Sequence, residues 1–184
     1  MKKKIGNYLF KVKREQQSES PDEWGDDERF LVYDHRDFCV QRKGYDAKEI
    51  FESVQKKKTF EGYWVFPVYA YIHGGVSLSV GSHNFPDARW DVSMKGFALI
   101  KREPGSYTEK AALKAAEGLI ETWNQYLSGE VYEYRIYEKS KDETGKKQKE
   151  LIDSCSGFYG KEYCMTEAES IVNHIIENKL TIEV

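Results

Sequence analysis

Apolar residues that recur at intervals of three and four positions predict three amphipathic helices in this chain. Each of these stretches begins with an acidic or hydroxyl residue that can cap a helix, followed by a glutamate three positions later. The helices are expected at 46–58, 106–129 and 166–178. The first helix should end within the lysine run at 56–58, because positive charges are favourable near a helix C-terminus.

Alternating or continuous apolar stretches between the helices predict β-strands. Pro67 lacks an amide hydrogen, which places its part of a strand at a sheet edge or a bulge. The polar stretch 139–149 is expected to be a loop, and Gly74-Gly75 a tight turn between antiparallel strands. The strands are expected at 8–12, 30–33, 63–72, 76–80, 95–101, 132–136 and 151–159.

This order of elements predicts an α+β fold and not a doubly wound nucleotide-binding fold. An antiparallel sheet of about five to seven strands is expected, with three helices that cover mainly one of its faces. Residues 1–184 are expected to form a single domain, in which 1–28 could be a flexible or loosely packed N-terminal segment.

Hydrophobic residues make up 40% of the 184-residue chain, enough for a core that needs no disulfide or metal. No apolar run approaches the roughly 20 residues that span a bilayer, and the first lysines precede no secretory signal. Three cysteines are present (Cys39, Cys155 and Cys164), an odd number without CxxC spacing. We therefore expect reduced thiols in the cytoplasm of a bacterial host cell, and neither a metal site nor a cofactor.

The net charge of −3 argues against a general nucleic-acid binder, which would show a basic excess. The signs are nevertheless sorted along the chain. Residues 1–14 contain six basic and no acidic residues, whereas 18–28 contain six acidic and no basic residues. The acidic stretch is typical of a solvated loop. A second interpretation, a contact for a basic groove on a partner, is favoured by Trp24, since aromatic anchors are enriched at interface hot spots.

Catalytic and metal-binding patterns are weak. His73 and His83 flank a hairpin strand and could converge with Asp91, although exposed histidines at a hairpin are the more favoured interpretation. The stretch 34–37 places an acid, a base and a cation near Cys39, a grouping that a catalytic cysteine could use. A small core residue is nevertheless the better interpretation of Cys39.

Several aromatic residues could either pack in the core or anchor a partner. Tyr126 follows Trp123 on the second helix, and Phe158-Tyr159 stands between two glycines. Trp90 and Asp91 form a further candidate patch, for which a buried tryptophan and a turn-capping aspartate are the alternative.

From Ser20 to about Cys164 the chain resembles a widespread group of small proteins encoded by phages and mobile elements of Firmicutes and their relatives. The residues that carry the resemblance are Ser20–Trp24, Phe66–Val76, Arg89–Asp91 with Gly96 and Phe97, Trp123–Tyr132 and Asp153–Gly160.

The resemblance implies an antagonist of host defence, similar to the anti-CRISPR proteins that block a type II effector nuclease stoichiometrically. Its partner would be that nuclease or its guide-RNA complex, with nucleic acid alone less favoured and no membrane. Two alternatives stay open: an enzyme that acts on a nucleotide or a defence component, and a phage accessory protein that binds nucleic acid through the basic N-terminal stretch and aromatics. The predicted partner-binding residues are Asp22, Glu23, Trp24, Asp26, Asp27, Trp90, Asp91, Tyr126, Phe158 and Tyr159.

Overall fold

The computed structural model describes residues 1–55, 59–85, 91–102 and 108–182, the last four of these by their backbone alone. Within them the chain contains three α-helices, one 3-10 helix and ten strands, so the expected α+β class is confirmed. The contacts group the chain into two compact units: unit 1 (Met1–Glu19 and Gly129–Val184) and unit 2 (Ser20–Ser128). That all residues form one domain stays a prediction.

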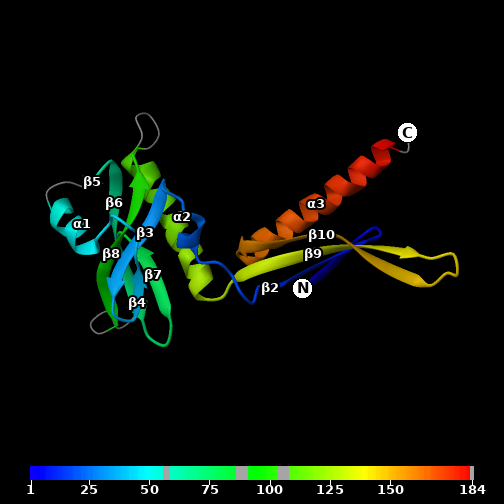
Figure 1. Ribbon diagram of the computed structural model, residues 1–184, viewed down its shortest axis with the longest axis horizontal. Helices are drawn as coiled ribbons and strands as arrows, with labels where there is room; N and C mark the ends of the chain where they lie inside the picture. The colour runs from blue at the N-terminus through cyan, green and yellow to red at the C-terminus, as the bar shows by residue number, and fades with distance from the viewer. Residues whose placement is uncertain (56–58, 86–90, 103–107, 183–184) are drawn as a thin grey trace. The chain divides into compact units, whose positions relative to one another are not determined.

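The six strands of unit 2 form one antiparallel sheet. Its order is β4-β3-β8-β6-β5, and β7 also pairs with β6 (Figure 1). The strands of this unit are β3 (Arg29–His35), β4 (Phe38–Val40), β5 (Thr59–Phe60), β6 (Tyr63–Ile72), β7 (Val76–Val80) and β8 (Val92–Lys101).

The two α-helices of unit 2 cover opposite faces of this sheet, whereas the sequence predicted helices mainly on one face. Helix α2 (Glu109–Leu127) packs against Leu31 and Tyr33, and α1 (Ala47–Val54) packs on the side of Phe30 and Val32. Consecutive strand residues point to opposite faces. A strand that is apolar at consecutive positions therefore needs cover on both sides.

The helix caps follow the sequence in one case and shift in the other. The carboxylate of Asp46 accepts hydrogen bonds from the amides of Lys48 (2.9 Å) and Glu49 (3.0 Å) at the start of α1, as expected. The cap of α2 is Thr108, whose hydroxyl accepts from the amide of Ala111 (3.3 Å). The predicted cap, Ser106, lies outside the described residues, as does the 56–58 lysine run.

Pro67 lies in β6 between the part paired with β5 and the part paired with β7. Its carbonyl accepts from the amide of Gly81 (2.8 Å) on that side. Because the carbonyl and the missing amide hydrogen of a strand residue face the same neighbour, the proline removes no hydrogen bond to β8. The register with β8 shifts next to it, between Val68 and Tyr69.

Unit 1 contains a separate four-stranded antiparallel sheet, so the strands divide between two sheets where the sequence predicted one. The order is β1-β2-β9-β10, with β1 (Lys2–Ile5), β2 (Tyr8–Arg14), β9 (Val131–Lys141) and β10 (Lys147–Tyr159). Helix α3 (Lys161–Ile182) lies along one face of it (Figure 1). The core between them consists of Tyr8, Phe10, Val12, Tyr132, Tyr134, Ile136, Cys164, Ala168 and Val172.

Helix α3 begins at Lys161, before the expected start at Thr166. Cys164 lies four positions before Ala168, so the buried stripe extends one turn further towards the N-terminus than predicted. The hydroxyl of Thr166 donates to the carbonyl of Glu162 (3.0 Å) inside the helix and caps nothing. Gly160, with a φ of 89°, separates the helix from β10.

The loop predicted at 139–149 is shorter in the structure, where only 142–146 connect β9 to β10. The carboxylate of Asp142 accepts hydrogen bonds from the amides of Thr144 and Lys146, both at 2.9 Å. Hydrogen bonds from the Thr144 hydroxyl and then from the Lys146 amide lower the pKa of Asp142. This hydrogen-bonded turn joins the two strands directly, so the charged residues on either side of it belong to β9 and β10 and not to a loop.

Candidate functional site

The predicted acidic stretch forms an ordered turn in unit 2, called here the acidic turn (residues 20–28). It begins with the 3-10 helix η1 (Pro21–Trp24). The amide of Ser20 donates to the carboxylate of Glu23 (2.6 Å), the reciprocal half of a capping box. Gly25 ends the helix with a φ of 67°, in the left-handed region that favours glycine. The turn is therefore preorganised by its own residues.

Trp24 is half exposed, with 50% of its surface accessible, at the end of η1. The side chains of Asp22 and Glu23 next to it are also exposed. The acidic turn thus presents a large ring beside two carboxylates. Tryptophan is enriched among residues that dominate binding energy in protein interfaces.

Asp26 and Asp27 instead hold the turn on the sheet. Asp26 accepts hydrogen bonds from the amide of Glu28 (2.8 Å) and from Nε of Arg29 (3.1 Å). Partial burial acts to raise the pKa of Asp26, but these hydrogen bonds outweigh it and the pKa is lowered. Asp27 forms an ion pair with Arg42. Both carboxylates were predicted to bind a partner. Each has a cationic partner within unit 2, but the Asp27 side chain is 83% exposed, and binding by these two residues stays a prediction.

The far end of the acidic turn is anchored by Tyr63, and this contact predicts a loss of stability in alkali. The Tyr63 hydroxyl donates to the carbonyl of Asp27 (3.0 Å), and burial, followed by interaction with Tyr45, raises its pKa from 10.0 to about 12. The hydroxyl is protonated in the fold up to a higher pH than in the unfolded chain. Its contribution is therefore complete below pH 10 and is lost as the pH rises towards 12.

We expect Tyr63→Phe to be less stable than the wild type by about 1 kcal/mol at pH 9, the usual net value of one hydrogen bond. The difference in free energy of unfolding between the two proteins should be smaller at pH 11.5, because the wild type then loses the contribution of the Tyr63 hydroxyl. Urea unfolding at both pH values measures it. A gap that stays constant contradicts the assignment.

The second predicted patch is only partly described. Trp90 lies outside the described residues. Asp91 is half-buried, and its Oδ2 lies 3.3 Å from Nδ1 of His73. The amide of Ile72 donates to the Asp91 carbonyl (2.9 Å), which ties it to the end of β6. The ring of His83 lies instead 4.8 Å from that of Tyr69, so the structure pairs one of the two histidines with Asp91.

Aromatic rings continue from there on the sheet face that α1 partly covers. Tyr71 stacks on His73 (6.1 Å between centroids) and on Phe85 (5.6 Å), and His83 stacks on Phe85 (5.7 Å). Tyr69 lies opposite Met94 of β8, so the two side chains share this face. The His83 imidazole is half-buried among these rings, whereas the side chain of His73 is 71% exposed.

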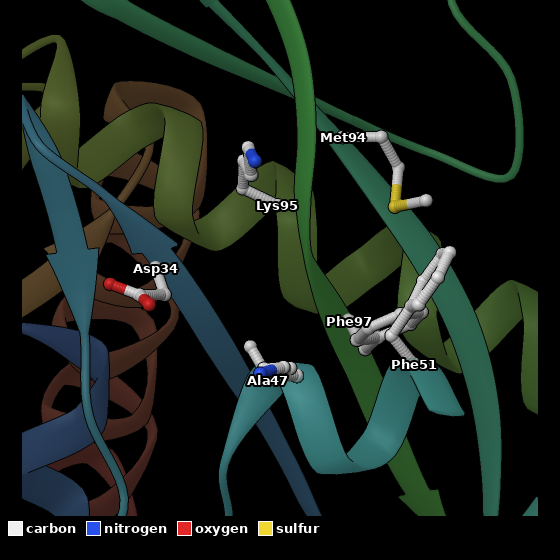
Figure 2. Close-up of a pocket in the computed structure, with 7 residues that line it drawn as sticks. Asp34, Ala47, Phe51, Met94, Lys95 and Phe97 are labelled. Carbon is white, nitrogen blue, oxygen red and sulfur yellow. The ribbon is translucent and has the colours of Figure 1, made fainter. Parts of the chain in front are cut away.

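A pocket of about 330 Å³ lies on the same face, between α1 and β8 (Figure 2). Met94 points from β8 towards the ring of Phe51, which lies beside Phe97, with centroids 6.5 Å apart (Figure 2). Phe51 is 41% exposed. The pocket lining is completed by Asp34, Ala47, Lys48 and Lys95. Apolar walls with charged residues at the margin suit a side chain or small group of a partner.

The remaining predicted anchors are engaged within their units. Tyr126 packs on Trp123 in unit 2, with ring centroids 6.0 Å apart. In unit 1, Phe158 packs against Tyr134 (5.4 Å), and the Tyr159 hydroxyl donates to the carbonyl of Glu19 (2.6 Å). All three side chains are partly buried, so each one packs within its unit and keeps some exposed surface, and their role in partner binding stays a prediction.

The interpretation of Cys39 as a core residue is wrong, because Cys39 is exposed and the buried side chain of β4 is its neighbour Val40. The register pairs Cys39 with Asp34, and His35 with Phe38. Residues 34 and 35 point to opposite faces, so His35 and Cys39 do not share a side.

Sequence reasoning missed two exposed rings, Phe51 and Tyr163. Phe51 lies within the amphipathic helix predicted at 46–58, whose apolar side chains were expected to be buried. Tyr163 is 57% exposed and packs edge-on against Phe158 at 5.7 Å. Tyr163 lies between the predicted strand (151–159) and the predicted helix (166–178), so the sequence assigned it to neither element, whereas in the structure it belongs to the first turn of α3.

No family model, curated protein or solved structure matches the chain. Among the described residues, no three histidine, cysteine or carboxylate side chains are grouped so that they could hold a metal ion. None of the helices in the described part of the chain has the length and apolar character needed to cross a membrane.

Proposed function

We propose that the protein is a stoichiometric inhibitor that docks onto another macromolecule through the acidic turn of unit 2. The partner is a type II CRISPR effector nuclease or its guide-RNA complex, and the protein acts as a phage or mobile-element antagonist of host defence. The resemblance of Ser20–Trp24 and the other motifs to that group supports the choice of partner.

The observation that carries the proposal is the half-exposed Trp24 on a turn capped at both ends. A side chain presented on a preformed turn loses little conformational freedom when it binds, which leaves more of the contact energy as affinity. The neighbouring Asp22 and Glu23 supply negative charge that complements a channel built to hold nucleic acid.

The stoichiometry of inhibition tests the mode of action. Increasing amounts of the protein are added to a fixed amount of purified nuclease with its guide RNA, and cleavage of a target duplex is measured. We expect a sharp endpoint near one molecule of protein for each nuclease. Several nuclease molecules inactivated by each protein molecule would instead identify an enzyme.

Trp24→Ala tests the surface. Truncation of a hot-spot residue costs about 2 kcal/mol or more, which corresponds to a roughly 30-fold higher inhibition constant. Phe51→Ala is the matched control, because it removes another large exposed ring of unit 2. If Phe51→Ala weakens inhibition and Trp24→Ala does not, the docking surface is the pocket beside α1 and the assignment to the acidic turn is wrong.

The double variant Asp22→Asn with Glu23→Gln tests the charge. Both substitutions keep an acceptor oxygen for the contacts with Ser20 and remove two negative charges. We expect weaker inhibition and a smaller dependence on salt, since exposed charges are screened over about 10 Å at 0.1 M ionic strength. Unchanged values for both measurements would exclude the charges from the mechanism.

A further inference from the structure

The sheet of unit 1 has one face covered by α3 and an opposite face that carries no helix of the described residues of unit 1 (Figure 1). Alternate residues of each strand point to this second face, and residues paired across strands share it. Glu133 is the only carboxylate at these strand positions, and we call the surface the basic face. Its side chains are Lys2, Lys4, Leu9, Lys11, Lys13, Glu133, Arg135, Tyr137, Lys139, Lys141, Lys147, Lys149 and Leu151.

The strand register arranges the basic face in rows that run across the strands. An apolar row occupies the middle, and a basic row lies on each side of it, about 7 Å away along the strand direction. Leu151, at one end of the middle row, is 51% exposed, and Lys4 stands at the other end. The three rows are Lys2–Lys11–Arg135, Leu9–Tyr137–Leu151 and Lys139–Lys149.

Tyr137 gathers two ammonium groups at the centre of this face. Nζ of Lys149 lies 3.3 Å, and Nζ of Lys11 5.3 Å, from the centroid of its ring. Desolvation, followed by hydrogen bonding and charge repulsion with Lys11 and then by the positive charges of Lys2 and Lys139, lowers the pKa of Lys149. Like charges held this close repel one another, and a bound anion would relieve that repulsion.

The one carboxylate of the face is already engaged. Oε1 of Glu133 lies 2.9 Å from Nζ of Lys13 and 3.1 Å from Nε of Arg135. The face is also concave: a hollow of about 590 Å³ is lined by Lys2, Lys11, Arg135 and Tyr137 together with Met1, Val12 and Lys13.

The net charge of the whole chain does not reveal this surface, because basic and acidic residues of unit 1 gather on opposite sides of its sheet. The helix on the other face of the same sheet, α3, carries Glu162, Glu167, Glu169 and Glu177. Of these, Glu169 pairs with Lys3, a β1 residue that points to the α3 side (2.6 Å). A predominantly basic surface therefore exists on a chain of net charge −3.

We propose that the basic face binds a single strand of nucleic acid, with phosphates along the two basic rows and bases against Leu9, Tyr137 and Leu151. Unpaired strands combine anionic groups with exposed apolar base faces, which is the combination that these rows match. A duplex keeps its bases stacked inside and offers nothing to the middle row. An anionic lipid surface matches the charge but has no planar groups to pack on a ring. This site is separate from the acidic turn and goes beyond the proposed inhibition.

The test is binding of a fluorescein-labelled, mixed-sequence oligonucleotide of about 12 nucleotides to the full chain, measured by anisotropy as RNA and as DNA. We expect log K to fall linearly with log salt, with a slope of about −0.7 for each phosphate neutralised. The double variant Lys11→Gln with Lys149→Gln should bind at least tenfold more weakly and reduce the slope by about 1.4.

The matched control is Lys114→Gln with Lys161→Gln, two exposed helix lysines whose removal changes the net charge equally. This control should bind like the wild type. Tyr137→Ser should weaken binding roughly fivefold or more without changing the salt slope, as expected for loss of one base contact. In the wild type, the bound oligonucleotide should protect Lys11 and Lys149 from acetylation.

Equal losses in the basic-face variant and its control would overturn the proposal. So would tighter binding of the matched duplex, or binding of vesicles of phosphatidylserine and phosphatidylcholine without binding of the oligonucleotide. Acetylation of Lys11 and Lys149 that the oligonucleotide leaves unchanged would overturn it without any substitution. Because these variants lie in unit 1 and the inhibition variants in unit 2, failure of one proposal leaves the other intact.

Discussion

Gly96→Ala is expected to destabilise unit 2 by at least about 3 kcal/mol, at the severe end of the range for overpacked interiors. A Cβ at this position would lie 2.2 Å from the carbonyl oxygen of Val32 and 2.4 Å from Cδ2 of Tyr33. Tyr33 is fully buried, and its hydroxyl donates to the carbonyl of Ser93 (2.7 Å), so its ring has no room to withdraw. The backbone oxygen of Val32 cannot move without breaking the pairing of β3 with β8.

Tryptophan fluorescence during urea unfolding measures this effect, because all four tryptophans of the chain lie within 20–128. Gly118→Ala is the matched control. A Cβ at Gly118 would meet nothing within 4 Å, and replacement of a helical glycine stabilises by up to about 1 kcal/mol. The two substitutions should therefore shift the midpoint in opposite directions. A Gly96→Ala midpoint equal to that of the wild type would contradict the packing described here.

The sequence predicted the helices better than the sheets, because helices depend on residues close together in the chain. The cap at Asp46 and the apolar spacing of Ile120 and Trp123 are local signals, and both are found in the structure. Strand order depends on distant pairs such as β2 with β9, where Lys11 lies opposite Arg135. No local pattern contains that information, so the division into two sheets could not be predicted.

The predicted binding residues show the same limit. The concentration of six acidic residues within 18–28 is visible in the sequence, but it does not reveal that Arg42 pairs with Asp27 or that Arg29 binds Asp26. Part of the negative charge of the stretch is therefore already paired within unit 2. The exposed ring of Trp24 could be anticipated, since a tryptophan in a polar stretch has few apolar neighbours to bury it.

The sequence shows the lysines of the basic face, but only the pairing of the strands shows that they share one surface. Lysines alternate with core residues in β2, where Lys11 and Lys13 flank Val12, and the same alternation occurs around Arg135 in β9. Each strand alone looks like an ordinary half-exposed strand. Only the antiparallel register adds their charges on one surface, which a net charge of the whole chain averages away.

The acidic turn and the basic face carry opposite charge and therefore suit partners of opposite charge. An acidic turn suits the positive channel of a nuclease, whereas the basic face suits the nucleic acid that such a channel holds. Two results together would show that one inhibitor makes two separate contacts. Inhibition would weaken when Trp24 is removed, and oligonucleotide binding would weaken when Lys11 and Lys149 are neutralised.

Ala168→Asp is expected to destabilise unit 1 by roughly 3–5 kcal/mol, the cost of an uncompensated buried charge. Ala168 is fully buried in α3 between Cys164 and Val172, in the core that α3 forms with the sheet. The new carboxylate would have no described cation within that core. It would either stay unpaired among apolar side chains or push α3 off the sheet, and both outcomes open the sheet to water.

Amide hydrogen exchange in β2 and β9 measures this loss, since the sheet that carries the basic face is protected on its other side by α3. Asn173→Asp adds the same charge at an exposed position of the same helix and should leave protection unchanged. Oligonucleotide binding should fall in Ala168→Asp, because the rows of lysines depend on the strand register that α3 stabilises. Wild-type protection of β2 and β9 in Ala168→Asp would show that α3 does not hold this sheet, and the register behind the basic face would then lack its support.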